Sequence, residues 1–257
     1  MNILAEIVEK LKPRLENRKR VLPMEVLAEQ AAQTPARPKF AAAFYGDGLH
    51  VIAELKKASP SKGLIRNNFD VQSLATELAE NGATALSVLT EPYYFLGSEE
   101  NLAIAAKMVS IPLLRKDFIF DEYQILEAKA LGASCVLLIA AMLSAERFVQ
   151  LLEYAHNQGL DVLGEAHSEK ELEMAVKADL VGVNARDLRT FGTSLERSAE
   201  LIRTIPKDRV AIAESAIRSR ADMDTMTAAG AKGFLIGETL MRAEHPGLKL
   251  KELLQCC

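Results

Sequence analysis

Residues 135–165 read CVLLIAAMLSAERFVQLLEYAHNQGLDVLGE, and the order of apolar and polar residues in this stretch decides the fold. The apolar segment Cys135–Ile139 is followed by an amphipathic segment at 144–158 and by a second apolar segment at 162–165. The pair Gln158-Gly159 is typical of a helix end. We therefore expect a strand, a helix and a second strand, and the connection is long enough for the two strands to run parallel.

The same alternation continues outward from this unit in both directions. Strands are expected at residues 51–55, 85–89, 112–115, 135–139, 162–165, 180–184, 210–213 and 233–236, and helices between them at 71–81, 121–131, 144–158, 168–176, 195–205 and 219–229. Most of these strands are near-continuous apolar runs, as a parallel sheet covered on both faces requires. Eight strand–helix units most economically close into a (β/α)8 TIM barrel. The alternative, a doubly wound open sheet, is less favoured because no G-x-G-x-x-G follows the first strand.

The first 45 residues have a different pattern. Ile3, Ile7 and Leu11 recur at helical spacing ahead of Pro13, and a second amphipathic segment occupies residues 24–32. We expect residues 1–45 to form an N-terminal helical extension packed on the barrel. No linker or low-complexity segment divides the rest, so residues 1–257 are expected to form a single (β/α)8 barrel domain.

Composition and charge argue against several classes of function. Lys and Arg number 31 and Asp and Glu 35, a net charge of −4, and no concentrated basic stretch for nucleic acid is present. The longest apolar run, at 135–143, is much shorter than the roughly 20 residues that span a bilayer. Glu6 and Glu9 are unlike a signal or transit peptide. We therefore expect a cytoplasmic protein that binds neither nucleic acid nor membrane, as a monomer or weak homo-oligomer.

The cysteines and histidines predict neither a disulfide framework nor a metal site. Cys135 lies inside an apolar run and is expected to be buried. Cys256 and Cys257 are expected to be exposed thiols, since the alternative, a lipid-attachment signal, lacks a neighbouring basic or amphipathic anchor. The four histidines show no i, i+4 pairing. His167 follows a predicted strand and is expected at the surface or beside the site.

Polar side chains follow most of the predicted strands, at the end of a barrel where active sites form. Lys56 and Lys116 leave the first and third strands. Two ammonium groups in one cavity suggest an anionic substrate, or a lysine tuned as an acid or Schiff-base former. Glu165, at the end of the fifth strand, is a candidate general base, with a structural ion pair as the alternative. Asn184 and Arg186 are placed to orient that carboxylate or to bind an anion.

Two further features indicate the kind of ligand. Backbone N–H groups at Ser215-Ala216 and Gly237-Glu238 follow the last two strands, where barrels commonly bind phosphate. Only the backbone of Glu238 is expected to contribute, because its carboxylate would repel phosphate. Phe95 and Phe118 in loops at the mouth suggest an apolar portion of the substrate.

These residues lie in stretches that resemble the indole-3-glycerol phosphate synthase family. The most specific stretch is IAELKKASPSKG at residues 52–63. Further matches follow in order: LTE at 89–91, LRKDF at 114–118, GVNARDL at 182–188, AES at 213–215 and LIGETLM at 235–241. The resemblance covers the whole chain, including the N-terminal extension.

The resemblance implies a reaction and a role for each matched residue. The substrate would be 1-(2-carboxyphenylamino)-1-deoxyribulose 5-phosphate, which yields indole-3-glycerol phosphate, CO2 and water without a metal or organic cofactor. Lys116 would be the general acid toward the ribulose carbonyl oxygen and Glu165 the general base for dehydration, positioned by Asn184. Lys56 would contact the substrate carboxylate, with Glu54 as its ionic partner. The other implied positions are substrate contacts at Arg186, Glu214, Ser215, Phe95 and Phe118, and a phosphate site at Ser59, Ala216, Gly237 and Glu238.

The sequence departs from the family pattern at Gly164, Ala166, Ala185 and Ala216, and the segment 191–194 lacks an acidic residue. None of these differences removes a proposed catalytic group. Two alternatives stay open at this point. One is another phosphate-binding barrel enzyme, such as a sugar-phosphate isomerase or a Schiff-base aldolase, and the other is a barrel that binds phosphate without catalysis.

Overall fold

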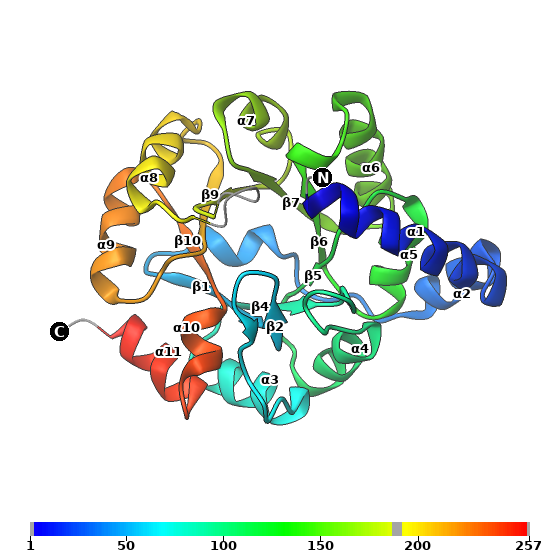
Figure 1. The fold of residues 1–257 in the computed structure, drawn as a ribbon, viewed down its shortest axis with the longest axis horizontal. Coiled ribbons are helices and arrows are strands. Elements are labelled where there is room, and N and C mark those ends of the chain that lie inside the picture. Colours follow the sequence, from blue (N-terminus) through cyan, green and yellow to red (C-terminus); the bar gives the residue numbers. More distant parts are fainter. Residues whose placement is uncertain (1–2, 187–191, 256–257) are drawn as a thin grey trace.

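Eight parallel strands form a closed barrel in the computed structural model, which describes residues 3–186 and 192–255 (Figure 1). The barrel strands are β1 (His50–Leu55), β4 (Ala85–Leu89), β5 (Leu113–Lys116), β6 (Cys135–Ile139), β7 (Asp161–Ala166), β8 (Leu180–Asn184), β9 (Val210–Glu214) and β10 (Gly233–Ile236). Their order around the barrel follows the chain, and β1 closes it by pairing with both β4 and β10. The (β/α)8 barrel is therefore confirmed, and the open sheet is excluded. The predictions for Asp187, Leu188, Phe191, Cys256 and Cys257 lie outside the described residues.

Helices cover the outside of the barrel. They are α3 (Val71–Glu80), α4 (Glu99–Met108), α5 (Glu122–Ala130), α6 (Ala145–Asn157), α7 (Glu169–Ala175), α8 (Leu195–Thr204), α9 (Arg220–Ala229), α10 (Glu238–Arg242) and α11 (Pro246–Leu254). Several begin with a side-chain cap: Asp70, Ser144 and Ser219 each accept a backbone N–H of the first turn. The six predicted ranges correspond to α3 and α5 to α9, whereas α4 and α11 have no predicted counterpart.

Side chains alternate along each barrel strand between the interior and the outer helices. In β1, Ile52 belongs to the interior apolar cluster, and Val51 and Ala53 belong to the layer beneath the helices. The same period turns Glu54 inward, where it lines a cavity. The other strands that end in this way contribute Lys116, Glu165, Asn184 and Glu214. The alternation of side chains along the strands therefore places these polar residues together at one end of the barrel.

The N-terminal segment forms α1 (Ile3–Val21), α2 (Met24–Gln33) and a short 3-10 helix, η1 (Ala41–Phe44). α1 continues through Pro13, and its second half still contacts the barrel: Arg18 pairs with both Glu99 and Glu127. Phe44 of η1 lies against Gly233, the first residue of β10. η1 therefore covers the end of the barrel where the strands begin.

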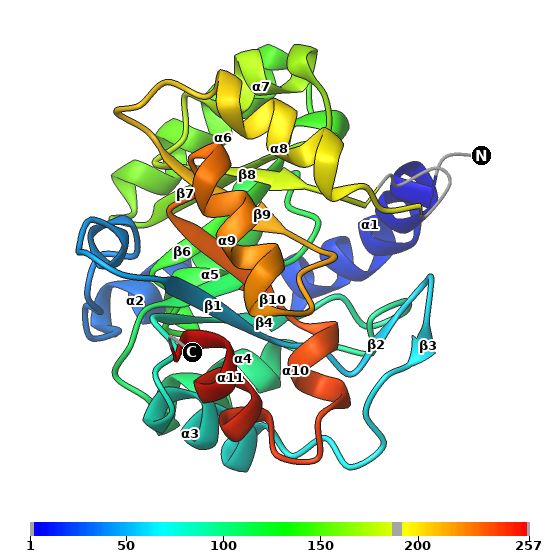
Figure 2. The same ribbon diagram turned by 90° about the vertical axis from the view of Figure 1, so that its left-hand side faces the viewer.

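α1 and the hairpin of β2 (Ala58–Ser59) and β3 (Gly63–Leu64) lie on the same side of the barrel (Figure 2). This is the side where the strands end, because residues of α1, of the hairpin and of the strand ends line one cavity. The beginning of the chain and the segment after β1 thus form part of the cavity wall. None of the helices in the described part of the chain is long and apolar enough to cross a bilayer.

Candidate active site

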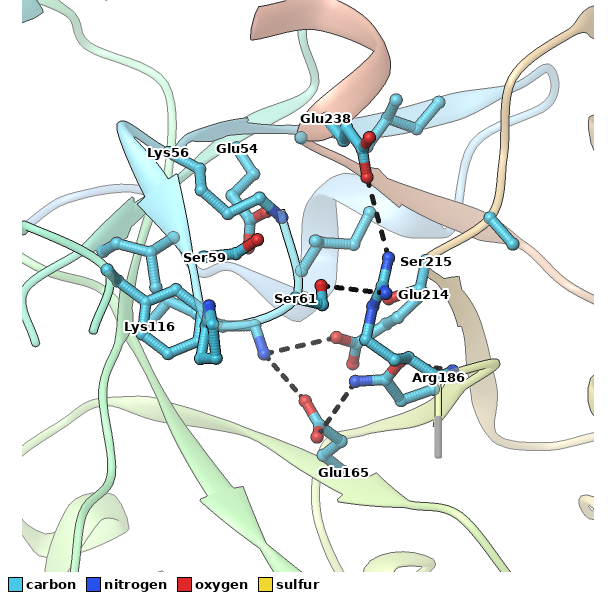
Figure 3. Close-up of a pocket in the computed structure, with 18 of the residues that line it drawn as sticks. Glu54, Lys56, Ser59, Ser61, Lys116, Glu165, Arg186, Glu214, Ser215 and Glu238 are labelled. Atoms are coloured by element: carbon cyan, nitrogen blue, oxygen red, sulfur yellow. Dashed lines mark hydrogen bonds and ion pairs between the residues drawn. The ribbon is translucent and has the colours of Figure 1, made fainter. Parts of the chain in front are cut away.

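A cavity of about 310 Å³ opens at the C-terminal end of the barrel, and a cluster of buried charges lies at its base (Figure 3). Lys116 Nζ lies 2.7 Å from Glu165 Oε2 and 3.4 Å from Glu214 Oε2. Asn184 donates a hydrogen bond to Glu165 Oε1 at 3.2 Å. Both oxygens of Glu165 are therefore held, one by a cation and the other by a neutral donor. The fold brings these four predicted site residues together from β5, β7, β8 and β9.

Lys116 gives the two carboxyl groups opposite protonation behaviour. Burial by itself would raise the pKa of Glu165, but the Lys116 charge outweighs burial and lowers that pKa to about 2. Glu214 is farther from Lys116, and burial together with the neighbouring carboxylates raises its pKa to about 8. Burial would lower the pKa of Lys116, but the surrounding carboxylates raise it instead. At neutral pH the cluster therefore holds an ionised Lys116–Glu165 pair beside a protonated Glu214.

Two glycines make room for the carboxylates of this cluster. A Cβ at Gly182 would overlap the carboxylate of Glu214, and a Cβ at Gly237 would overlap that of Glu54. Glu54 is ion-paired with Lys56, so the predicted pair is present. The backbone can therefore approach the Glu214 and Glu54 carboxylates at positions 182 and 237 only because glycine has no side chain.

The wall nearest α10 combines unusual backbone with polar side chains. Ser215 and Ala216 both have left-handed backbone, with φ of +66° and +60°. Turns of unusual backbone conformation can present N–H groups to an anion. Ser59 and Gly237 line the same cavity as these residues. Arg186 donates a hydrogen bond to the Ser61 hydroxyl at 3.0 Å. The residues predicted for phosphate thus all border one cavity, at positions 59, 216, 237 and 238.

The side chain of Glu238, which was not expected to contribute, pairs with cations on this wall. Its carboxylate lies 3.0 Å from Arg242 Nε, 3.6 Å from Arg186 Nη2 and 3.9 Å from Lys62 Nζ. Three cations on one carboxylate leave this wall positively charged. Arg242 lines the cavity, although no sequence motif pointed to it.

Apolar side chains form another wall. Phe95 and Phe118 lie with their ring centroids 6.0 Å apart, and Leu4 and Ile7 of α1 line the same cavity. Phe95 is held in place by Glu91, a fully buried carboxylate that accepts the Phe95 N–H at 2.9 Å. The helical spacing of Leu4 and Ile7 predicted an extension on the barrel but not that this extension lines the site.

His167 lies beside the charged cluster, which excludes the surface position considered from the sequence. Its side chain is 13% exposed, with ring nitrogens 3.5 Å from Glu165 Oε1 and 3.3 Å from Glu171 Oε2. The neighbouring small residues fit the packing of α7, since a Cβ at Gly164 would come within 2.9 Å of the Ala175 carbonyl oxygen. Cys135 is fully buried, as predicted.

No group of three or more His, Cys, Asp or Glu side chains within residues 3–186 and 192–255 is arranged to hold a metal ion. The clustered carboxylates at the base of the cavity have lysines as their partners: Lys56 for Glu54 and Lys116 for Glu165. The arrangement is suited to proton transfer and to binding an anion with an apolar portion.

Comparison with known proteins identifies the family. A family model described as "Indole-3-glycerol phosphate synthase" matches residues 4–253. The indole-3-glycerol phosphate synthase of Campylobacter jejuni subsp. jejuni serotype O:23/36 (strain 81-176) is 46% identical over 257 residues, which cover 98% of this chain and 100% of that protein. The chain belongs to the indole-3-glycerol phosphate synthase family. A relative of the same name from Alkaliphilus metalliredigens (strain QYMF) is 42% identical, covering 98% of this chain and 97% of that protein.

The expected activity, that of an indole-3-glycerol phosphate synthase and carbon–carbon lyase of tryptophan biosynthesis, is confirmed by these matches. The family match decides against a sugar-phosphate isomerase or an aldolase.

Two solved structures are similar at low identity. A 3-hexulose-6-phosphate synthase has a TM-score of 0.62 at 15% identity, covering 80% of this chain and 98% of that one. A thiamine phosphate pyrophosphorylase from Pyrococcus furiosus has a TM-score of 0.57 at 20% identity, covering 80% and 93%. At these identities the likeness shows the barrel fold alone.

Proposed function

We propose that this chain converts 1-(2-carboxyphenylamino)-1-deoxyribulose 5-phosphate to indole-3-glycerol phosphate, with Lys116 as general acid and Glu165 as general base. The observation that carries the proposal is the 2.7 Å contact between Lys116 Nζ and Glu165 Oε2 at the base of the cavity. Attack of the aromatic carbon on the ribulose carbonyl places negative charge on its oxygen, and a preplaced ammonium group donates a proton there. Loss of CO2 from the attacking carbon then restores the aromatic ring.

Glu165 acts in the later dehydration, in which it removes a proton from the newly closed ring and passes it to the departing hydroxyl group, which leaves as water. A carboxylate with a pKa near 2 is a weak base, but that low pKa depends on the positive charge of Lys116. Once Lys116 has given up its proton, the pKa of Glu165 rises and the carboxylate becomes a stronger base. The acid step therefore prepares the base step.

The family resemblance suggests the binding roles, and the composition of the cavity walls supports them. Lys56, held by Glu54, contacts the substrate carboxylate, and Glu214 contacts the substrate beside Lys116. The anthranilate ring packs against Phe95 and Phe118. The phosphate is bound on the wall of positions 59, 186, 215, 216, 237 and 238. The enzyme works in the cytoplasm as a monomer or weak homo-oligomer, and residues 1–257 form one domain in which the extension at 1–45 completes the site.

The test is to mix the purified protein with this substrate and follow indole fluorescence. The chain contains no Trp, so the background is low. We expect a rise in signal with the wild-type protein and a loss of roughly 10² to 10⁴ in kcat for Lys116→Ala. Lys107→Ala, on the exposed side of α4, is the matched control and should keep full activity. Absence of product with the wild-type protein would refute the reaction, and near-native kcat in Lys116→Ala would refute the role of that lysine.

A further inference from the structure

His167 lies directly beyond the proposed base, two residues after Glu165 along the chain. His167 follows the end of β7 directly, and its ring lies beside the Glu165 carboxylate. His167 Nε2 lies 3.5 Å from Glu165 Oε1, and Nδ1 lies 3.3 Å from Glu171 Oε2. Both ring nitrogens are buried, and each lies within ion-pair distance of one of these carboxylates. The buried imidazole of His167 therefore lies between the carboxylates of Glu165 and Glu171.

The same turn fixes the ring and the acid behind it. Glu171 accepts the backbone N–H of His167 at 2.7 Å, and Ser168 caps α7 by accepting the N–H of Glu171. Exposure of the side chains increases outward, from 2% at Glu165 to 13% at His167 and 24% at Glu171. Glu171 is therefore a fixed counter-charge on the outer side of the ring.

The charged groups that face the ring are mostly carboxylates. Glu165 of β7, Glu171 of α7 and Glu214 of β9 act on it directly, and Lys116 of β5 lies on the far side of Glu165. Burial would lower the pKa of His167, but the carboxylates outweigh burial and raise it. Imidazolium is therefore favoured to higher pH than in a free histidine.

We propose that His167 is a positioning residue for the general base, and that it serves as the cation beside Glu165 when Lys116 acts on the substrate. Lys116 cannot remain paired with Glu165 while it donates its proton to the carbonyl oxygen, and it is neutral once that proton has gone. Without His167, Glu165 would then keep only the neutral amide of Asn184, and burying a carboxylate without a counter-charge is unfavourable. His167 lies on Oε1, whereas Lys116 contacts Oε2, so Oε2 is released toward the cavity. The inference rests on the proposed function, because it concerns the base of that reaction.

The test compares His167→Gln with the wild-type protein in kcat, KM and pH dependence. Glutamine keeps a polar donor but carries no charge. We expect kcat to fall roughly tenfold because a charged contact to the base is lost, and KM to stay within about twofold. The acid limb of kcat should move to higher pH, since Glu165 has lost a nearby positive charge. His156→Gln is the matched control: His156 pairs with Asp179 at 2.9 Å outside the cavity, and this variant should keep the wild-type profile.

A second measurement does not depend on turnover. The chain has four histidines, so the ring signals of His167 can be assigned in NMR spectra by difference from His167→Gln. We expect its pKa to lie above the ordinary value of 6.5 and to fall in both Glu165→Gln and Glu171→Gln. An ordinary or lowered pKa would overturn the proposal. So would a His167→Gln variant with a lower Tm but unchanged kcat and pH profile. If the wild-type protein does not turn over the substrate, the proposed function fails, while the titration still decides whether His167 is a cation between these carboxylates.

Discussion

Lys116 of β5 and Glu165 of β7 form an ion pair 2.7 Å long, although the proposed reaction needs one as an acid and the other as a base. Each side chain stabilises the charged form of the other, which raises the pKa of Lys116 and lowers that of Glu165. Paired in this way, the lysine is a weak acid and the carboxylate a weak base. In the proposed reaction the substrate has to separate them, and a carbonyl oxygen placed beside Lys116 would do so. Lys116 would then become a stronger acid and Glu165 a stronger base only when the substrate is bound.

Replacing Glu214 with glutamine should stabilise the protein increasingly as pH rises. Burial and the neighbouring carboxylates raise the folded-state pKa of Glu214 from 4.5 to about 8. The folded protein therefore holds a proton that the unfolded chain has lost, and the stability due to this group is full below pH 4.5 and is lost as pH rises through about 8. Thermal melts from about pH 5 to about pH 9 check this. A Tm difference that does not change with pH would contradict the protonated state of Glu214.

Replacing Ala216 with glycine should stabilise the fold and strengthen phosphate binding. The φ of +60° at Ala216 costs an L-residue roughly 1 kcal/mol, which glycine avoids. Part of that gain is offset by the greater freedom of glycine in the unfolded chain, so we expect about 0.5 kcal/mol in urea unfolding. KM should fall because the anion approaches the backbone without meeting a methyl group. Ala128→Gly, in the ordinary helical backbone of α5, is the control and should lose roughly 1 kcal/mol or more. Destabilisation by both changes would show that φ at Ala216 carries no cost.

Replacing Gly182 with alanine should damage the site more than replacing a glycine that lies away from the buried carboxylates. The new Cβ would overlap the Glu214 carboxylate and push it against the Lys116–Glu165 pair. We expect a fall in kcat of roughly tenfold or more from misplacement of reacting groups, with a loss of about 1–3 kcal/mol in the free energy of unfolding from overpacking. Gly46→Ala is the control, because its Cβ would meet only the His50 ring, at 3.7 Å. Equal effects of the two substitutions would contradict this account of Gly182.

Replacing Arg18 with alanine should raise KM as well as lower stability. Arg18 joins α1 to Glu99 and Glu127, and Glu127 also holds the fully buried Arg115 at 2.7 Å. Loss of these pairs should cost roughly 1–3 kcal/mol in urea unfolding. KM should rise because α1 carries part of the cavity wall. Arg20→Ala is the control, since Arg20 contacts Asn17 within its own helix. An unchanged KM in Arg18→Ala would show that the position of α1 does not affect substrate binding.

The barrel and the position of its charged residues can be predicted from the spacing of apolar residues in the sequence. Apolar runs such as 135–139 identify the strands, and the residues just beyond them must meet at one end of a parallel barrel. Lys116 and Glu165 could therefore be predicted to face a common cavity before any distance was known. The two-residue strands β2 and β3 are too short to give a detectable alternation, so the hairpin could not be predicted in this way.

The remaining features depend on contacts between distant segments. Helical spacing shows that one face of α1 is buried but not that Leu4 and Ile7 face the site. The need for glycine at position 182 arises from a side chain on β9, which local sequence does not reveal. The partners of Glu238 likewise come from Lys62 and Arg186 as well as from its own helix.

The central claim, that Lys116 acts in ring closure and Glu165 in the later dehydration, is tested most directly by measuring CO2 release in a single turnover. Glu165→Gln should release about one CO2 per site while forming little indole-3-glycerol phosphate, because only the later proton removal is blocked. Lys116→Ala should release neither product at an appreciable rate. Loss of CO2 release in both variants, or normal product formation by Glu165→Gln, would contradict this division of roles.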